Sequence, residues 1–389
     1  MLSVWWPGFV PAVIYVVAGL LHLPRKYKHS EKYNEEQYDF ACKTAWRYTW
    51  QFGLLFVALN FMLMRSTRLM ANMGQLIILG VLLVVEIAAI WFLYVPVERA
   101  VKEKFGEDAD KLTELAYAKL NLTLEVGEKR SDGYHDLRSI MTSASLHDIV
   151  MVEKATEVTM RCDRADLPTD GRNLAVKAAL AFFEKTGIEG GCHIELAKCI
   201  PSEAGLGGGS SDAAAVLRAL RTLYAPDMPT EELESIGALV GSDVPYCVRG
   251  GTVLCEGRGE KMTTLPAMPQ CQYVIVKPDE AFPTGKMYGE IDAQNPTRRH
   301  TTDSMMVALE NGDLYAVAEK LENTFEQVIP ESSDVIAIRD ILKENGALNA
   351  MMSGSGSAVF GIFDDAAKAE VACKALENST RQIFLAESV

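Results

Sequence analysis

Positive charge is scarce in this sequence: 38 lysines and arginines stand against 52 aspartates and glutamates, and the net charge is −14. A nucleic-acid-binding surface needs a basic stripe, so this balance argues against a nucleic-acid partner. The eight cysteines are scattered and include no Cys-x-x-Cys pair, which excludes a zinc site or a disulfide framework built on regular spacing. We expect reduced, mostly buried thiols.

The glycine-rich stretch Pro201–Ser211 lacks the features of two common nucleotide loops. No lysine follows its last glycine, which excludes a Walker A loop, and no acidic residue lies where a dinucleotide fingerprint requires one. Its glycines free the backbone to adopt positive φ and to approach a ligand closely. A strand-like run, 193–200, precedes the loop, and Ser210, Ser211 and Asp212 are good N-cap residues for the helix that follows. These flanks disfavour a mobile linker and predict an anion site at a helix N-terminus.

Residues 1–97 contain three apolar stretches, which we interpret as three transmembrane helices: Val4–Leu23, Tyr48–Met64 and Gln75–Val97. About 20 apolar residues span a bilayer, so the first and third qualify outright and the second is borderline. A signal peptide is the alternative for the first stretch, which lacks a basic start and a small-residue cleavage site. Lysines and arginines gather in the first loop and after the third helix. This predicts a multi-pass membrane protein with its N-terminus outside and its C-terminal part in the cytoplasm.

Glu86 is the only charge in the third stretch. A carboxylate at that depth is either functional or a polar contact of Asn60 or Gln51 within a small bundle, and the sequence leaves both open. A charged connector follows at 98–113, and the rest of the chain has the character of an α/β protein without repeats or low-complexity segments.

Residues 117–126 alternate between apolar and polar side chains, which predicts a β-strand. Lys119, Asn121 and Thr123 share the polar face. A lysine in that position often marks the solvent side of an edge strand. Asn121 beside it makes a hydrogen-bonding patch, which favours a functional site.

Three further motifs follow along the chain. Arg130–His135 is predicted to be a turn that ends in an aromatic pair. Asp243 lies just past a predicted helix, where Pro245 blocks any continuation, and it is either functional or a turn former or cap. Met352–Gly361 is a second glycine-rich turn, which leads into a strand.

Together these motifs resemble the GHMP kinase superfamily. The glycine-rich loop and the Ser-Gly-Ser-Gly turn mark the superfamily, and Lys-Leu-Asn with Asp-Gly-Tyr-His marks a member that acts on a cytidyl-diphosphate-linked methylerythritol. The resemblance implies an α+β, two-domain GHMP kinase fold, with a ribosomal protein S5-like N-terminal half at 114–265 and a ferredoxin-like C-terminal half at 266–389, preceded by the transmembrane segment. It covers Leu115 to the C-terminus and rests on 118–122, 132–135, 201–211, 241–245 and 353–356.

The resemblance implies ATP-dependent phosphorylation of the 2-hydroxyl of that substrate, in the non-mevalonate isoprenoid pathway of a bacterium. Asp243 would be the general base and Lys119 its charge partner, with Asn121 helping to hold the diphosphate or the acceptor. Mg²⁺ is expected with ATP, near Ser210 or Ser211, but no carboxylate is assignable as a metal ligand. The implied ATP-binding residues are Pro201, Ser202, Glu203, Ala204, Gly205, Leu206, Gly207, Gly208, Gly209, Ser210 and Ser211.

On the substrate side, the resemblance implies that the cytosine ring stacks between Tyr134 and a second aromatic. The position after Pro283 and Thr284 makes that second ring Tyr288. His135 would hydrogen-bond the edge of the base. The structural alternatives are a buried turn aromatic and a histidine satisfied by other protein groups.

The sequence departs from the superfamily pattern at two places. Glu203 stands where a small residue or glycine is more usual. The membrane segment is not part of the pattern at all, and it is either a natural tether or the product of two joined reading frames. Another small-molecule kinase of the superfamily, acting on homoserine or mevalonate, is disfavoured by the Asp-Gly-Tyr-His motif. A membrane sensor or transporter subunit whose kinase-like domain only binds ligand is disfavoured by Lys119 and Asp243, because a binding module has no use for that pair.

Overall fold

The computed structural model describes residues 110–297, 299–377 and 380–389. The chain divides into two compact units, 1–109 and 110–389, and the description below concerns the second. The three predicted transmembrane stretches, Glu86 and the connector up to residue 109 lie outside the described residues. Lys111 to Thr113, which the sequence places in that connector, are the first residues of strand β1.

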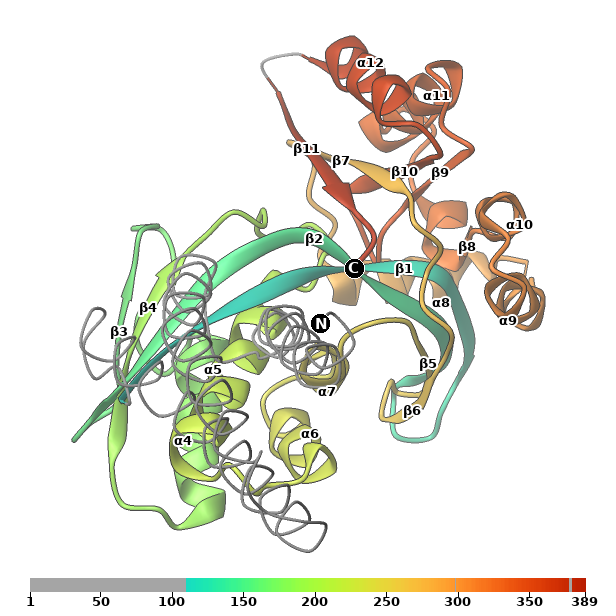
Figure 1. Ribbon diagram of the computed structural model, residues 1–389. Coiled ribbons are helices and arrows are strands. Elements are labelled where there is room, and N and C mark those ends of the chain that lie inside the picture. Colours follow the sequence, from blue (N-terminus) through green and yellow to red (C-terminus); the bar gives the residue numbers. More distant parts are fainter. Residues whose placement is uncertain (1–109, 298, 378–379) are drawn as a thin grey trace, which may run out of the picture. The chain divides into compact units, whose positions relative to one another are not determined.

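A long antiparallel hairpin forms the centre of the first sheet (Figure 1). Strand β1 (Lys111–Lys129) and strand β2 (His135–Ala155) meet at the predicted turn. The order of the sheet is β3-β4-β2-β1-β8, and β5 pairs with both β2 and β6. The remaining strands are β3 (Thr159–Cys162), β4 (Gly191–Ala197), β5 (Val253–Gly257), β6 (Lys261–Thr264) and β8 (Glu322–Asn323).

Four helices pack against this first sheet (Figure 1). Alanine and leucine, both strong helix formers, dominate α4 and α5 and leave them with broad apolar faces. Phe182, Ile194 and Leu217 are fully buried in the core between helices and sheet. The helices are α4 (Leu174–Thr186), α5 (Gly208–Tyr224), α6 (Thr230–Ala238) and α7 (Val244–Arg249).

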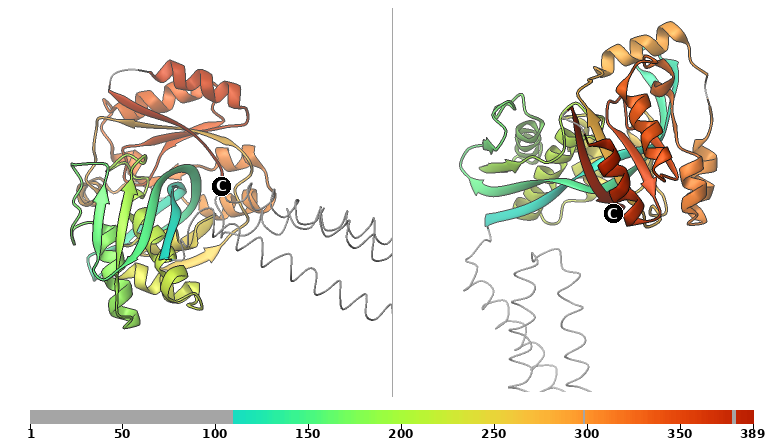
Figure 2. Two further views of the ribbon diagram at one scale, coloured as in Figure 1. Left: turned by 60° about the vertical axis from the view of Figure 1, so that its left-hand side comes forward. Right: turned by 90° about the horizontal axis from the view of Figure 1, so that it is seen from above.

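A second, antiparallel sheet has the order β11-β7-β10-β9 and carries α11 and α12 (Figure 2). In chain order its strands and helices give the βαββαβ arrangement of ferredoxin-like folds. The strands are β7 (Gln272–Pro278), β9 (Asn349–Met352), β10 (Val359–Phe363) and β11 (Arg381–Glu387). The helices of this part are α8 (Thr284–Gln294), α9 (Thr302–Glu310), α10 (Leu314–Glu319), the 3₁₀ helix η4 (Thr324–Val328), α11 (Asp334–Glu344) and α12 (Ala366–Leu376).

Strand β1 contributes to three hydrophobic cores in turn. Ala116 packs under the helices of the first sheet, Leu120 lies in the core between the two sheets, and Leu124 belongs to the core of the second sheet. On the opposite face Lys119 and Asn121 are also buried, with 5% and 2% of their surfaces exposed. Strand β2 pairs with β1 on one side, and on the other side the amide of Lys119 donates to Leu206 O at 2.9 Å. Lys119 is therefore not on the solvent side of an edge strand.

Two local predictions are wrong. The helical pattern of the sequence predicts a single helix over 314–326, but α10 ends at Glu319 and β8 then pairs in parallel with β1. The side chain of Asn323 explains this break, because it donates to Met352 O and Gly354 O at 2.8 Å and is committed to the neighbouring turn. The second error concerns α5, which begins at Gly208, so Ser210 and Ser211 lie within its first turn and Asp212 just after it, instead of capping it.

Candidate active site

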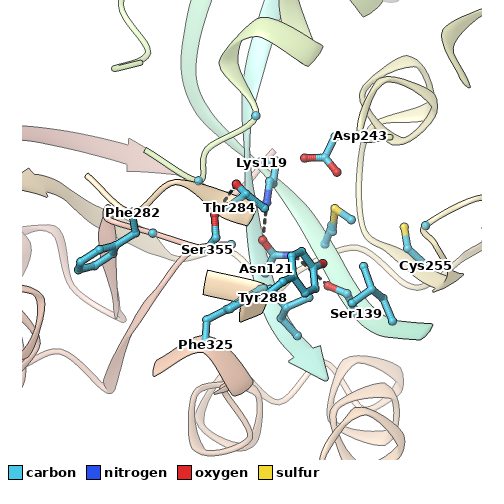
Figure 3. A pocket seen from close by; sticks show the side chains of 18 of the residues that line it. Lys119, Asn121, Ser139, Asp243, Cys255, Phe282, Thr284, Tyr288, Phe325 and Ser355 are labelled. Atoms are coloured by element: carbon cyan, nitrogen blue, oxygen red, sulfur yellow. Dashed lines mark hydrogen bonds between the residues drawn. The ribbon is translucent and has the colours of Figure 1, made fainter. Parts of the chain in front are cut away.

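A cavity of about 350 Å³ opens where the two halves of the described unit meet (Figure 3). Strand β1, the loop before α5, the loop before α7 and the start of α8 all reach it. Seven of the residues singled out from the sequence line it: Lys119, Asn121, Glu203, Gly205, Gly207, Asp243 and Tyr288. Tyr134 and His135 are not among its lining residues.

Lys119 is held in place by a short chain of hydrogen bonds. Its Nζ donates to Oδ1 of Asn121, and Nδ2 of Asn121 donates to Oγ of Ser139 at 2.8 Å. The hydroxyl of Ser139 in turn donates to the carbonyl oxygen of Thr123 at 2.6 Å. This chain fixes both ends of the Asn121 amide, so Asn121 serves first to orient the Lys119 ammonium. The sequence missed Ser139, which lies on the neighbouring strand and carries no motif of its own.

Asp243 stands at the N-cap position of α7, but its side chain makes no capping hydrogen bond. Among the described residues its carboxylate forms no ion pair, with Lys119 or any other cation. In Figure 3 the carboxylate turns toward Lys119. Cys255 on the cavity wall lies close enough to Asp243 and Lys119 for their charges to affect its pKa. Burial raises the pKa of that thiol to about 12, the charge of Asp243 raises it further and the charge of Lys119 lowers it. Asp243 is therefore a carboxylate on the cavity wall that has no ion-pair partner among the described residues.

The glycine-rich loop passes between Lys119 and the second glycine-rich turn. The amide of Lys119 donates to Leu206 O at 2.9 Å, and Oγ of Ser353 donates to Gly205 O at 3.0 Å. Gly205 and Gly207 have φ of 74° and 69°. A Cβ at Gly205 would lie 2.0 Å from Ser353 O, and one at Gly207 would lie 2.8 Å from Cγ of Lys119. Only glycine satisfies both the positive φ and this close approach.

Glu203 also has a positive φ, at 52°. That backbone conformation gives the physical reason why glycine would suit the position. The side chain is exposed and lines the cavity.

The loop ends at the N-terminus of α5, whose first N–H groups have no carbonyl partner within the helix. Gly208, Gly209 and Ser210 carry these groups, and the positive end of the helix dipole adds to them. The hydroxyl of Ser211 is already bound to Tyr117 O, so Ser210 keeps the hydroxyl that is not tied to β1. Within the described part of the chain, no cluster of three or more histidine, cysteine or carboxylate side chains could hold a metal ion.

A buried charged cluster that the sequence did not reveal lies beneath this loop. Nζ of Lys198 contacts the carboxylate of Asp148 and lies 2.8 Å from Oδ2 of Asp212. Burial raises the pKa of Asp212 to about 8, Lys198 opposes this shift and Asp148 adds to it. The three residues come from β2, the end of β4 and α5, so the cluster ties the strand before the loop to the helix after it. No sequence signal joins positions so far apart.

The predicted aromatic residues separate in the structure. Tyr288 lies on the cavity wall, where burial, and then the charge of Asp243, raise the pKa of its phenol to about 12. The ring of His135 stacks on it, with centroids 5.1 Å apart, and Phe325 meets it edge-on. Tyr134 is 57% exposed on the β1–β2 turn, and the guanidinium of Arg258 lies 5.0 Å from its ring centroid.

The fold is that of a GHMP kinase: residues 173–251 match the GHMP kinases N terminal domain, and residues 305–381 match the GHMP kinases C terminal region. Homoserine kinase from Cytophaga hutchinsonii shares the fold, with a TM-score of 0.57 at 18% identity over 72% of this chain and 95% of that one. The prediction of an α+β, two-domain GHMP kinase fold is thereby confirmed.

More similar proteins identify the particular family. The chain is 41% identical over 276 residues to 4-diphosphocytidyl-2-C-methyl-D-erythritol kinase of Clostridium beijerinckii, a match that covers 70% of this chain and 99% of that one. The enzyme of the same name from Caldicellulosiruptor saccharolyticus is 42% identical over 273 residues, 69% of this chain and 94% of the relative. A crystal structure of 4-(cytidine 5'-diphospho)-2C-methyl-D-erythritol kinase matches with a TM-score of 0.61 at 31% identity, over 72% of this chain and 100% of that one. The chain belongs to the 4-diphosphocytidyl-2-C-methyl-D-erythritol kinase family and is an ATP-dependent small-molecule kinase.

The localisation predicted from the sequence, a multi-pass membrane protein, is wrong. Among the residues that the structure describes, no helix has the length and apolar character needed to cross a membrane. The match to the Clostridium beijerinckii relative covers 99% of that protein but only 70% of this chain. The lipid bilayer that we inferred as a partner from residues 1–97 is therefore not supported either.

Proposed function

We propose that this kinase transfers the γ-phosphoryl group of ATP to the 2-hydroxyl of 4-diphosphocytidyl-2-C-methyl-D-erythritol. The observation that carries the proposal is the meeting of Lys119, Asp243, the glycine-rich loop and Tyr288 on the wall of one cavity. The relatives named above supply the substrate class, and the cavity supplies a group for each part of the reaction.

Asp243 is the general base. Its carboxylate has no protein partner among the described residues, so it can accept the proton of the substrate hydroxyl as that oxygen attacks. Lys119 places a fixed positive charge beside the reacting centre, where charge on the transferring group needs stabilisation. Asn121 and Ser139 keep that ammonium oriented.

The loop 201–211 and the N-terminus of α5 are proposed to bind the phosphates of ATP. Gly205 and Gly207 allow close approach of backbone to ligand, and the N–H groups of Gly208, Gly209 and Ser210 offer donors to phosphoryl oxygens. Mg²⁺ bound with ATP would neutralise charge on the β- and γ-phosphoryl oxygens. The described residues offer no cluster of histidine, cysteine or carboxylate ligands, so phosphoryl oxygens of the nucleotide and water would surround that ion.

Two substitutions test the roles of the base and of the ammonium. Asp243→Asn should lower kcat by about 10²–10⁴-fold, the usual contribution of a positioned base, with KM for ATP nearly unchanged. Lys119→Ala should also lower kcat, and Lys119→Arg should not restore it, because a planar guanidinium cannot replace a point charge bound to one amide oxygen. The assay couples ADP release to NADH oxidation with the cytidyl substrate as acceptor. Near-normal turnover of Asp243→Asn would remove Asp243 from the mechanism.

A further inference from the structure

His135 is buried beside the cavity in a defined environment. Only 4% of its side chain is exposed, and Nε2 lies 2.9 Å from Oδ1 of Asp292 on α8. Its ring is nearly parallel to that of Tyr288, with an interplanar angle of 17°. Two neighbouring elements, β2 and α8, therefore fix both the position and the plane of the imidazole.

Asp292 is held as a charged acceptor. Nζ of Lys129 lies 2.5 Å from its second oxygen. The hydrogen bonds from Lys129 and then from His135 lower the pKa of Asp292. An ionised carboxylate can only accept hydrogen bonds. Nε2 of His135 must then carry the proton, and in the neutral ring Nδ1 is left as an acceptor.

The stacking geometry shows how Nδ1 could meet a base. Centroids 5.1 Å apart in nearly parallel rings describe an offset stack, so His135 covers only part of the Tyr288 face. A base stacked on the rest of that face would lie in nearly the same plane as the imidazole, edge to edge with it. Cytosine presents an amino donor at position 4, whereas uracil presents a carbonyl acceptor there. An acceptor at Nδ1 would bind the first and repel the second.

We propose that Asp292 is a positioning residue that holds His135 in the Nε2–H tautomer and thereby makes the site select cytidyl over uridyl ligands. This inference rests on the proposed function, because it assumes that the base stacks on Tyr288. The sequence singled out His135 for base recognition but gave no role to Asp292 or Lys129.

The test compares the binding of CDP and UDP to the full chain by calorimetry, with a non-hydrolysable ATP analogue at saturation. In Asp292→Asn the amide can donate to Nε2, which moves the ring proton to Nδ1 and reverses its role. The preference for CDP over UDP should fall by about 10- to 100-fold, in the range seen for loss of one base-reading contact. Asp292→Glu keeps an acceptor and should retain most of the preference. The matched control is Glu290→Gln, the same change of charge on the same helix at a side chain that bonds Gln294 and not His135.

A second measurement does not depend on any variant of Asp292. Nitrogen-15 NMR of the histidine rings in the full chain, assigned by the signal lost in His135→Gln, should show the Nε2–H tautomer. The NMR measurement overturns the inference if the ring of His135 carries its proton on Nδ1 or is doubly protonated. The binding comparison overturns it if Asp292→Asn keeps the preference for CDP, or if the wild-type protein binds neither nucleotide. If the wild type prefers CDP through Asp292 yet phosphorylates no cytidyl substrate, the proposed function fails and the inference stands.

Discussion

Gly207 brings the glycine-rich loop into close contact with Lys119, the proposed catalytic lysine, and replacing Gly207 with alanine tests whether that contact sets the position of Lys119. Gly207 has φ 69° and ψ 18°, and an added Cβ would lie 2.8 Å from Cγ of Lys119. Two effects follow, a backbone effect on stability and a steric effect on the ammonium. They can be measured separately.

The backbone effect is the left-handed conformation forced on a residue with a Cβ, which costs about 1–2 kcal/mol. At about 2–4 °C per kcal/mol for a unit of this size, Tm should fall by about 2–8 °C. The steric effect arises because carbon atoms settle at about 3.5–4.0 Å, so Lys119 must move by roughly 0.7 Å or more. A misplacement approaching 1 Å at a reacting centre can lower the rate by about 10²-fold. We expect kcat to fall by about 10- to 100-fold.

Gly187→Ala is the matched control, because Gly187 has nearly the same backbone, φ 67° and ψ 12°, with no atom within 4 Å of an added Cβ. It caps α4, far from the machinery described above, and should show the loss of Tm without the loss of kcat. The measurements are scanning calorimetry and the coupled kinase assay on both variants. If Gly207→Ala turns over within threefold of Gly187→Ala, the loop does not position Lys119 and the reasoning is refuted.

Three further outcomes are expected. The stacking role predicted for Tyr134, which is exposed and does not line the cavity, is tested by Tyr134→Ala. KM for the cytidyl substrate should rise by an amount equivalent to about 1–3 kcal/mol with KM for ATP unchanged; an unchanged KM for the cytidyl substrate would remove Tyr134 from the base site. Burial raises the pKa of Asp212 in the folded protein to about 8, well above the ordinary range of an aspartate, so its contribution to stability is present at low pH and is lost as pH rises toward 8. Lys198→Met, which leaves Asp148 and Asp212 unpaired, should therefore lower Tm more at pH 8.5 than at pH 5.5, and an equal loss would argue against the buried cluster. Residues 110–389 expressed alone should fold and keep kcat within about threefold, since the relatives are matched almost end to end by this unit; a folded but inactive product would place part of the site before residue 110.

Periodicity and turn chemistry were enough to predict many elements. The alternation in 117–126 predicts β1. The apolar, helix-favouring segments 174–186 and 366–376 predict two helices, and α4 and α12 have these bounds in the structure. These patterns are local, so the chain itself carries the signal. Resemblance to the superfamily then brought Lys119, Asp243 and the glycine-rich loop together, and the structure places them around one cavity.

Elements that depend on distant partners were missed. The two-residue strand β8 is too short to show an alternation of apolar and polar residues. It forms because it pairs in parallel with Thr123 and Leu124 of β1. The same limit applies to the site. The bond between His135 and Asp292 spans 157 positions and leaves no trace in either local sequence.

The contribution of β1 to three cores has a consequence for folding kinetics. The C-terminal end of this strand bonds to residues that are synthesised much later, since the amide of Val126 donates to Oγ1 of Thr324, 198 positions away. Pairings so distant in sequence slow folding, because loop closure must precede the contacts that reward it. During synthesis, Thr123 and Leu124 of β1 have no partner on this edge until β8 has left the ribosome, and an unpaired edge invites association with other chains. Once β8 has paired, the amides at this end of β1 should exchange with solvent later than those of α9 or α12.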